Sequence, residues 1–202
     1  MRGQALALFP PAYQQTAGRD RLDRYYTPAA VAEACVSWLP IEDAAQVLEP
    51  HGGGGAFWRA LVRKGHAVDV LDVDPMAPVW DCQLHQPGGP VAPCRHVQEF
   101  LSWTPGKAFH WVIGNPPYRD AELHVRKALE VSRRHVCFLL RLGFLESQER
   151  FPFWSSSPLR HVFVLSRRPS FDGVGTCATA YGFFWWDHLH QGPATLSVES
   201  WT

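Results

Sequence analysis

The sequence predicts an α/β fold in which a mostly parallel sheet carries helices on both faces. Three observations support this prediction: strand-like apolar runs alternate with helical periodicity, a glycine-rich turn joins the first strand to a helix, and two strand-like runs follow one another towards the C-terminus. With 202 residues, 46% of them hydrophobic, the chain can bury the core of one domain. We therefore expect an N-terminal arm over 1–24 and a single domain over 25–202.

The first half of the domain reads as a helix followed by a βαβ unit. A helix is predicted over 28–39, with Thr27 as its N-cap and a proline at its first position. Residues 47–48 form a short strand that runs into a glycine cluster, residues 56–64 resume the helical pattern, and residues 67–72 read as a second strand. The glycine turn therefore lies at the carboxyl end of the first strand.

Further strands and one more helix follow in the second half. A short strand is expected near Val97, and two consecutive prolines must end the apolar run over 109–114. The remaining predicted elements are a helix over 120–132, a buried strand over 135–142, and two strands over 161–165 and 181–186. Together these elements predict a seven-stranded sheet with a terminal antiparallel strand. The expected ligand site is the rim at the carboxyl ends of the parallel strands.

Charge and cysteine content exclude several classes of protein. Nineteen basic and nineteen acidic side chains give a formal net charge of zero, which is not typical of a polybasic nucleic-acid wrapper or an acidic tail. The five cysteines are odd in number and never form a CxxC pair, which favours a reducing cytoplasm over a disulfide framework. The apolar stretch over 136–145 is interrupted by Arg141 and too short to span a bilayer, and no signal peptide is expected.

A possible metal cluster lies within and directly after the Gly/Pro-rich connection over 75–93. Cys82 and His85 lie within this connection, and Cys94 and His96 follow it. Zinc would order such a loop, but the second spacing is short for a ligand pair. The sequence therefore leads us to expect no metal.

The first motif with chemical content is the glycine turn. Glu49, Pro50 and His51 precede four consecutive glycines, whose missing Cβ atoms let a ligand lie against the backbone. Asp72 ends the next strand, 23 residues after Glu49. A carboxylate at this place can accept hydrogen bonds from both hydroxyls of a ribose. The spacing therefore favours a nucleoside-containing ligand over a plain turn.

The second motif is Asn115-Pro116-Pro117-Tyr118, directly after the strand over 109–114. It fits methyl transfer to an exocyclic amine. The N6 lone pair of adenine is delocalised into the ring, so the nitrogen is a poor nucleophile until acceptors hold its hydrogens. The side-chain oxygen of Asn115 and a proline carbonyl can be those acceptors, and such preorganised groups are typically worth ~3 to 4 kcal/mol each. No dedicated general base is then needed.

These motifs, in this order, resemble the S-adenosylmethionine-dependent N6-adenine DNA methyltransferases, in the small stand-alone form typical of phages and prophages. The resemblance runs from about residue 25 to 187. It implies a Rossmann-like methyltransferase fold, S-adenosyl-L-methionine as cofactor, and DNA as substrate in a bacterial or phage-infected cell. The catalytic residues that it implies are Asn115, Pro116, Pro117 and Tyr118.

The resemblance also assigns cofactor contacts. Tyr26, Thr27 and Pro28 would help to hold the methionine part, Glu49 its amino group, and Phe57 would lie on the sulfonium side. Gly53 and Gly55 belong to the cofactor loop, Asp72 would bind the ribose, and Glu99 and Phe100 would bind the adenine. Asn115 is also expected to contact the cofactor. Three positions depart from the family pattern: His51 replaces a small residue, Glu99 is longer than the usual aspartate, and His110 replaces an aspartate.

DNA contacts are expected from the catalytic loop and from the second half of the chain. Double-stranded DNA requires the target base to be flipped out, with single-stranded DNA as the alternative. Tyr118 and Phe171, the latter in a segment that resembles the family's base-packing loop, would stack on the base. Candidate phosphate contacts are Arg119, Arg126, Arg167 and Arg168. No segment is long enough for a separate target-recognition domain.

Two alternatives remain open from the sequence. Similar catalytic loops serve RNA adenine, cytosine N4 and a glutamine amide in proteins, so the substrate could differ while the chemistry stays the same. A non-catalytic cofactor-binding or DNA-binding subunit of a larger assembly is the alternative from another class.

Overall fold

A computed structural model describes residues 26–81, 94–171 and 177–201. The first half contains α1 (Ala29–Ser37), β1 (Gln46–Glu49), α2 (Ala56–Arg63), β2 (Ala67–Asp72), the 3₁₀ turn η1 (Pro78–Asp81), β3 (Arg95–Val97) and β4 (Phe109–Gly114). The second half contains α3 (Ala121–Val131), β5 (Ser132–Arg141), the 3₁₀ turn η2 (Leu142–Leu145), α4 (Phe151–Ser156), β6 (Leu159–Leu165), β7 (Tyr181–Asp187) and β8 (Thr195–Glu199). The predicted arm over 1–24 lies outside the described residues.

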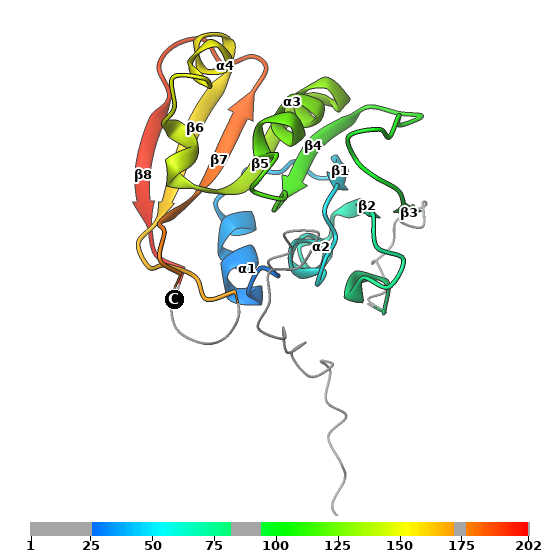
Figure 1. The fold of residues 1–202 in the computed structure, drawn as a ribbon. Coiled ribbons are helices and arrows are strands. Elements are labelled where there is room, and N and C mark those ends of the chain that lie inside the picture. Colours follow the sequence, from blue (N-terminus) through cyan, green and yellow to red (C-terminus); the bar gives the residue numbers. More distant parts are fainter. Residues whose placement is uncertain (1–25, 82–93, 172–176, 202) are drawn as a thin grey trace, which may run out of the picture.

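One sheet of eight strands organises the described residues, in the order β3-β2-β1-β4-β5-β7-β6-β8 (Figure 1). Strands β1 to β5 pair in parallel, whereas β7 runs antiparallel to both β5 and β6. The mostly parallel sheet predicted from the sequence is confirmed. The antiparallel strand lies inside the sheet, and β8 adds an eighth strand, parallel to β6.

Both faces of the sheet are buried, because successive residues of the central strands enter different cores. Val47 packs with α1 and α2 on one face, and its neighbour Leu48 packs with α3 on the other. On β4, Trp111 and Val112 likewise pack into the cores on opposite faces of the sheet. The two helical layers on opposite sides of the sheet are visible in Figure 1. This two-sided burial explains the continuous apolar runs from which the strands were predicted.

The strand order reverses between β1 and β4. The chain leaves β1 through α2 towards β2, and it leaves β4 through α3 towards β5, so the connections diverge and open a crevice at the carboxyl ends of these strands. The two motifs of the sequence follow these strand ends. No helix among the described residues has the length and apolar character that a membrane crossing needs.

The start of α1 differs from the sequence-based prediction. Thr27 does not cap the helix; Pro28 occupies the N-cap position, and no side chain makes a capping hydrogen bond. The hydroxyl of Thr27 instead accepts a hydrogen bond from the side chain of Asn115, 3.1 Å away. The capping prediction was therefore wrong because a contact across 88 residues of sequence takes up this hydroxyl.

Candidate functional site

The glycine turn leads from β1 into α2 through two left-handed backbone positions. Gly53 has φ +46°, and Gly55, with φ +73°, is the N-cap of α2. A side chain is disfavoured at both places because this region of φ is strained for L-residues. A Cβ on Gly53 would also lie 3.3 Å from the ring of Tyr26. The turn thus brings backbone and the Tyr26 ring close together at the end of β1.

Gly52 is a further constrained position of the turn, which the sequence reasoning did not single out. A Cβ at Gly52 would lie 2.8 Å from both Val70 Cγ2 and Val79 Cγ1. Gly52→Ala is therefore expected to lower the free energy of unfolding by about 1 to 3 kcal/mol, as overpacking does. Gly106→Ala is the matched control because its Cβ would meet no atom within 4 Å. Denaturant unfolding of both variants tests this, and equal stability of the two would contradict it.

Asp72, at the end of β2, holds the glycine turn in place. Its Oδ2 accepts a hydrogen bond from the Gly53 amide at 2.7 Å, and its Oδ1 accepts one from the Asp74 amide at 2.8 Å. A carboxylate has about four lone-pair sites, so an oxygen that accepts from a backbone amide can also accept from a ligand hydroxyl. Asp72 is therefore both an anchor of the turn and a wall of the cavity described next.

A cavity of about 240 Å³ lies at the carboxyl ends of β1, β2 and β4. It is lined by Tyr26, Pro50, His51, Gly53, Leu71, Asp72, Val73, Gln98, Glu99, Phe100, Leu101, Asn115, Pro116, Pro117, Arg119, Asp120 and His124. A smaller hollow of about 20 Å³ shares four of these residues and adds Thr27, Glu49 and Phe57. Most of the predicted cofactor residues therefore come together here. Pro28 and Gly55 line neither space.

Glu49 lies in the smaller hollow and is 2% exposed. Burial raises the pKa of its carboxyl well above the usual value, although a backbone hydrogen bond with Trp58 and the charge of Arg59 act in the opposite direction. Its Oε2 atom makes no hydrogen bond with the described residues. An ammonium group bound in the hollow would satisfy this oxygen and stabilise the charged carboxylate. The residue thus fits the amino group of a methionine-like ligand.

Asn115 directly follows β4 and is oriented by the residue before α1. Its Nδ2 donates a hydrogen bond to Thr27 Oγ1, which orients the amide, and the Oδ1 atom of the same amide is a hydrogen-bond acceptor. Pro116 and Pro117 continue the same cavity wall. The loop therefore presents an acceptor from a backbone that two prolines keep rigid.

A pair of histidines forms part of the same cavity wall. His51 Nε2 lies 2.8 Å from His124 Nδ1 on α3. Burial lowers the pKa of both imidazoles, and the charge of His124 lowers the pKa of His51 further. The charges of Glu99 and Asp120 act in the opposite direction on the pKa of His124. The departure at His51 is thus explained by a neutral hydrogen-bonded pair. His124 carried no signal in the sequence, because a histidine in a helical repeat does not reveal its long-range partner.

Tyr118 and Phe171 contact each other, but not as the two walls of a base-stacking slot. Their ring centroids are 6.5 Å apart with planes at 68°, and neither ring lines the cavity. Tyr118 also packs on Tyr181 and lies under the guanidinium of Arg141, 4.8 Å from the ring centre. Burial raises the pKa of the Tyr118 hydroxyl. The two rings therefore meet edge to face and leave no slot between them, so stacking on a base would require them to separate.

The four candidate arginines are all exposed but differ in their contacts. Arg119 lines the cavity. Arg126 pairs with Glu122 at 2.9 Å and covers the ring of Phe153. Arg167 lies over the ring of Trp201, and Arg168 follows it in the chain. Arg119 is thus the candidate that the structure places at the site itself.

Comparison with known proteins gives a consistent picture of the fold. No family model matches the chain. The sequence is 35% identical over 118 residues to the type II methyltransferase M.TthHB8I of Thermus thermophilus. The matched region covers 55% of this chain and 24% of that protein. The chain thus spans about a quarter of the length of this curated relative.

Three solved structures illustrate the structural likeness. The M protein of the type I restriction enzyme EcoKI matches with a TM-score of 0.67 and 14% identity, over 90% of this chain and 49% of that one. The 23S rRNA methyltransferase ErmE matches with a TM-score of 0.61 and 15% identity, over 84% of this chain and 73% of that one. The third structure is the magnesium protoporphyrin IX methyltransferase of Synechocystis, solved with bound S-adenosylmethionine. It matches with a TM-score of 0.55 and 12% identity, over 78% of this chain and 76% of that one. The chain therefore has the fold of the S-adenosylmethionine-dependent methyltransferases.

Proposed function

We propose that the chain transfers a methyl group from S-adenosyl-L-methionine to N6 of adenine in DNA. The observation that carries the proposal is the position of Asn115: its amide is held by Thr27 at the rim of a cavity whose other walls contain Asp72 and the glycine turn. A methyl acceptor held by this amide would therefore adjoin the space for the cofactor. Similarity to a type II methyltransferase also supports a methyl-transfer function for this chain.

The residues of the two spaces suit the parts of this cofactor. We assign the ribose to Asp72, the adenine to Glu99 and Phe100, and the methionine amine to Glu49. Phe57 and the residues before α1 would enclose the remaining methionine part. When bound, S-adenosylmethionine supplies a methyl group activated by its positively charged sulfur.

Asn115 and a proline carbonyl of the loop would accept the two N6 hydrogens of the target base. Positive charge develops on N6 as the new N–C bond forms and the C–S bond breaks, so acceptors aimed at its hydrogens stabilise the transition state more than the ground state. One N6 proton then leaves to water. The proposed reaction uses no metal and no dedicated base.

A substrate comparison tests the function. The protein is incubated with S-adenosylmethionine carrying a labelled methyl group and, in separate reactions, with unmethylated DNA, RNA and protein. We expect label in DNA. Label in RNA or in a glutamine side chain would replace the DNA substrate and leave the chemistry in place, whereas cofactor binding without transfer to any of the three would favour a non-catalytic subunit.

Base stacking by Tyr118 and Phe171 is part of this proposal and is tested by mismatch rescue. Replacing either with alanine is expected to weaken binding of the target base by roughly 1 to 3 kcal/mol. A mismatch opposite the adenine should partly restore binding because less energy is needed to unpair the base. Fluorescence titration of matched and mismatched duplexes measures this. A loss that is equal on both duplexes would assign these rings a packing role only.

Phosphate contact by Arg119 is expected to appear as a change in salt dependence. Arg119→Ala should weaken DNA binding uniformly across sequences and reduce the slope of log affinity against log salt concentration by about 0.9. Arg126→Ala is the matched control because its guanidinium is already paired with Glu122. Binding isotherms at several salt concentrations test this. Identical slopes for Arg119→Ala and the unchanged protein would remove Arg119 from the DNA surface.

A further inference from the structure

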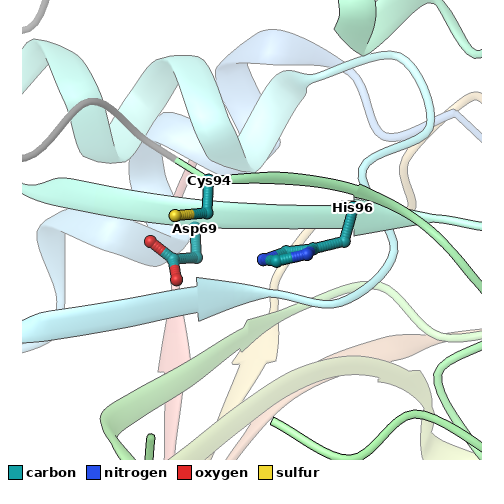
Figure 2. A group of neighbouring side chains, drawn as sticks. All are labelled: Asp69, Cys94 and His96. Atoms are coloured by element: carbon teal, nitrogen blue, oxygen red, sulfur yellow. The ribbon is translucent and has the colours of Figure 1, made fainter. Parts of the chain in front are cut away.

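Three different metal-binding side chains gather on β2 and at the start of β3, away from the cavity. The ligand atoms of Asp69, Cys94 and His96 all lie within 4.8 Å of one another. Figure 2 shows the three side chains on one side of the two strands, with the imidazole of His96 directed towards Asp69. None of them lines the cavity of the proposed methyl transfer.

The pairing of the two strands creates this arrangement. Cys94 and His96 are two residues apart in an extended segment, so their side chains point to the same face. The register pairs Val70 with Arg95 and Leu71 with His96, and the Val70 amide donates to the Cys94 carbonyl at 3.0 Å. Asp69 therefore lies beside Cys94 across the strands. The backbone of β2 and β3 thus sets the positions of all three ligands.

The chemistry of the set is that of a transition-metal site rather than of a calcium or magnesium site. Thiolate and imidazole are softer ligands than the carboxylate and carbonyl oxygens that the latter ions prefer. In a tetrahedral zinc site the ligand atoms would lie roughly 3.3 to 3.8 Å apart, given the usual zinc–ligand distances. Because Cys94 is exposed and His96 half-buried, small side-chain rotations can close the difference. A water molecule would complete four-coordination.

Two neighbours bear on the site. Lys107 Nζ lies 2.9 Å from Asp69 Oδ2, and its side chain is 37% exposed. A bound cation would take the place of this ammonium beside the carboxylate, and the partly exposed Lys107 side chain can move into solvent. The ring of Trp103 lies 5.1 Å from the ring of His96 and limits the orientations of the imidazole. Asp69 itself is buried, and its carboxylate has a cationic partner in Lys107, whose place a metal ion can take.

We propose that Asp69, Cys94 and His96 bind one transition-metal cation, best zinc, that ties the start of β3 to β2. In the sequence, Cys94 and His96 group with Cys82 and His85, and no metal is expected there. Cys82 and His85 lie outside the described residues. Asp69, from the neighbouring strand, is the ligand that the fold adds. The site is independent of the proposed methyl transfer, which uses no metal.

Cobalt(II) is the probe for the first test. Metal-free protein, titrated with Co²⁺ under reducing conditions, is expected to show a thiolate-to-cobalt charge-transfer band and the intense visible bands of tetrahedral cobalt, saturating at one equivalent. Zinc should displace the cobalt. Cys94→Ser, His96→Ala and Asp69→Asn should each weaken cobalt binding at least about tenfold. The matched controls Cys177→Ser and His190→Ala, outside the cluster, should leave it unchanged.

Alkylation provides a readout that needs no variant. Cys94 is exposed, so iodoacetamide should modify it in the metal-free protein, and one equivalent of zinc should protect it, as located by peptide mass spectrometry. Absence of the charge-transfer band, or equal alkylation with and without zinc, would overturn the proposal. A band that survives in Cys94→Ser would also overturn it. Unchanged affinity in a folded Asp69→Asn protein would exclude Asp69 and with it the three-residue site.

Discussion

Asn115→Ala is expected to slow methyl transfer by about 100-fold or more while leaving the affinity for S-adenosylmethionine nearly unchanged. The substitution deletes an acceptor that acts mainly when charge develops on the target nitrogen, and groups of this kind are worth ~3 to 4 kcal/mol. Because the Asn115 side chain is not the partner assigned to the ribose, adenine or amine of the cofactor, ground-state binding should persist. Single-turnover kinetics with labelled cofactor, together with calorimetry, measure both quantities.

Replacing Thr27 gives a second, milder variant that tests the orientation of Asn115. Thr27→Val keeps the shape of the side chain but removes the oxygen that accepts the Asn115 Nδ2 hydrogen. We expect a smaller loss of rate than for Asn115→Ala, since the acceptor is still present but less well oriented. A folded Asn115→Ala protein that turns over at the parent rate would show that this loop is not the active site.

Asp72→Ala is expected to weaken binding of S-adenosylmethionine by ~2 to 3 kcal/mol, or roughly 30- to 150-fold. The variant loses the acceptor assigned to the ribose hydroxyls. It also loses the hydrogen bonds from the Gly53 and Asp74 amides, so the turn itself becomes less ordered. Isothermal titration calorimetry measures the affinity.

Asp74→Ala is the matched control for Asp72. Asp74 is a carboxylate two residues further along, which accepts a hydrogen bond from the Met76 amide and does not line the cavity. Its replacement should leave the affinity within about threefold of the parent value. Equal affinity of the Asp72→Ala protein and the parent would refute the ribose assignment, and equal losses for both variants would attribute the effect to loop stability.

Local signals in the sequence were sufficient for the elements that carry the two motifs. The strand over 109–114 matches β4, whose carboxyl end is set by the two prolines that follow, and the glycine turn lies between β1 and α2 as predicted. Strand β8 was not predicted, since it is a short and largely exposed edge strand with a weak apolar pattern. Helix α4, with six residues, was missed because it is too short to show periodicity.

Contacts between distant residues account for what the sequence could not supply. The bond from Asn115 to Thr27 and the pair of His51 and His124 each join residues more than seventy positions apart. Nothing local indicates such a partner. Asp69 likewise reads as one strand residue among others until β3 places Cys94 beside it. The edge-to-face contact of Tyr118 with Phe171 depends on the packing of a loop, which the motif alone does not determine.

The identity of the methylated nucleoside tests the proposed methyl transfer to adenine most directly. Unmethylated duplex DNA is incubated with S-adenosylmethionine and either the parent protein or the Asn115→Ala variant, digested to nucleosides, and analysed by mass spectrometry. We expect N6-methyladenine with the parent protein and a level reduced by about 100-fold or more with the variant. Methylation on a ring carbon of cytosine, or N6-methyladenine formed equally by both proteins, would contradict it.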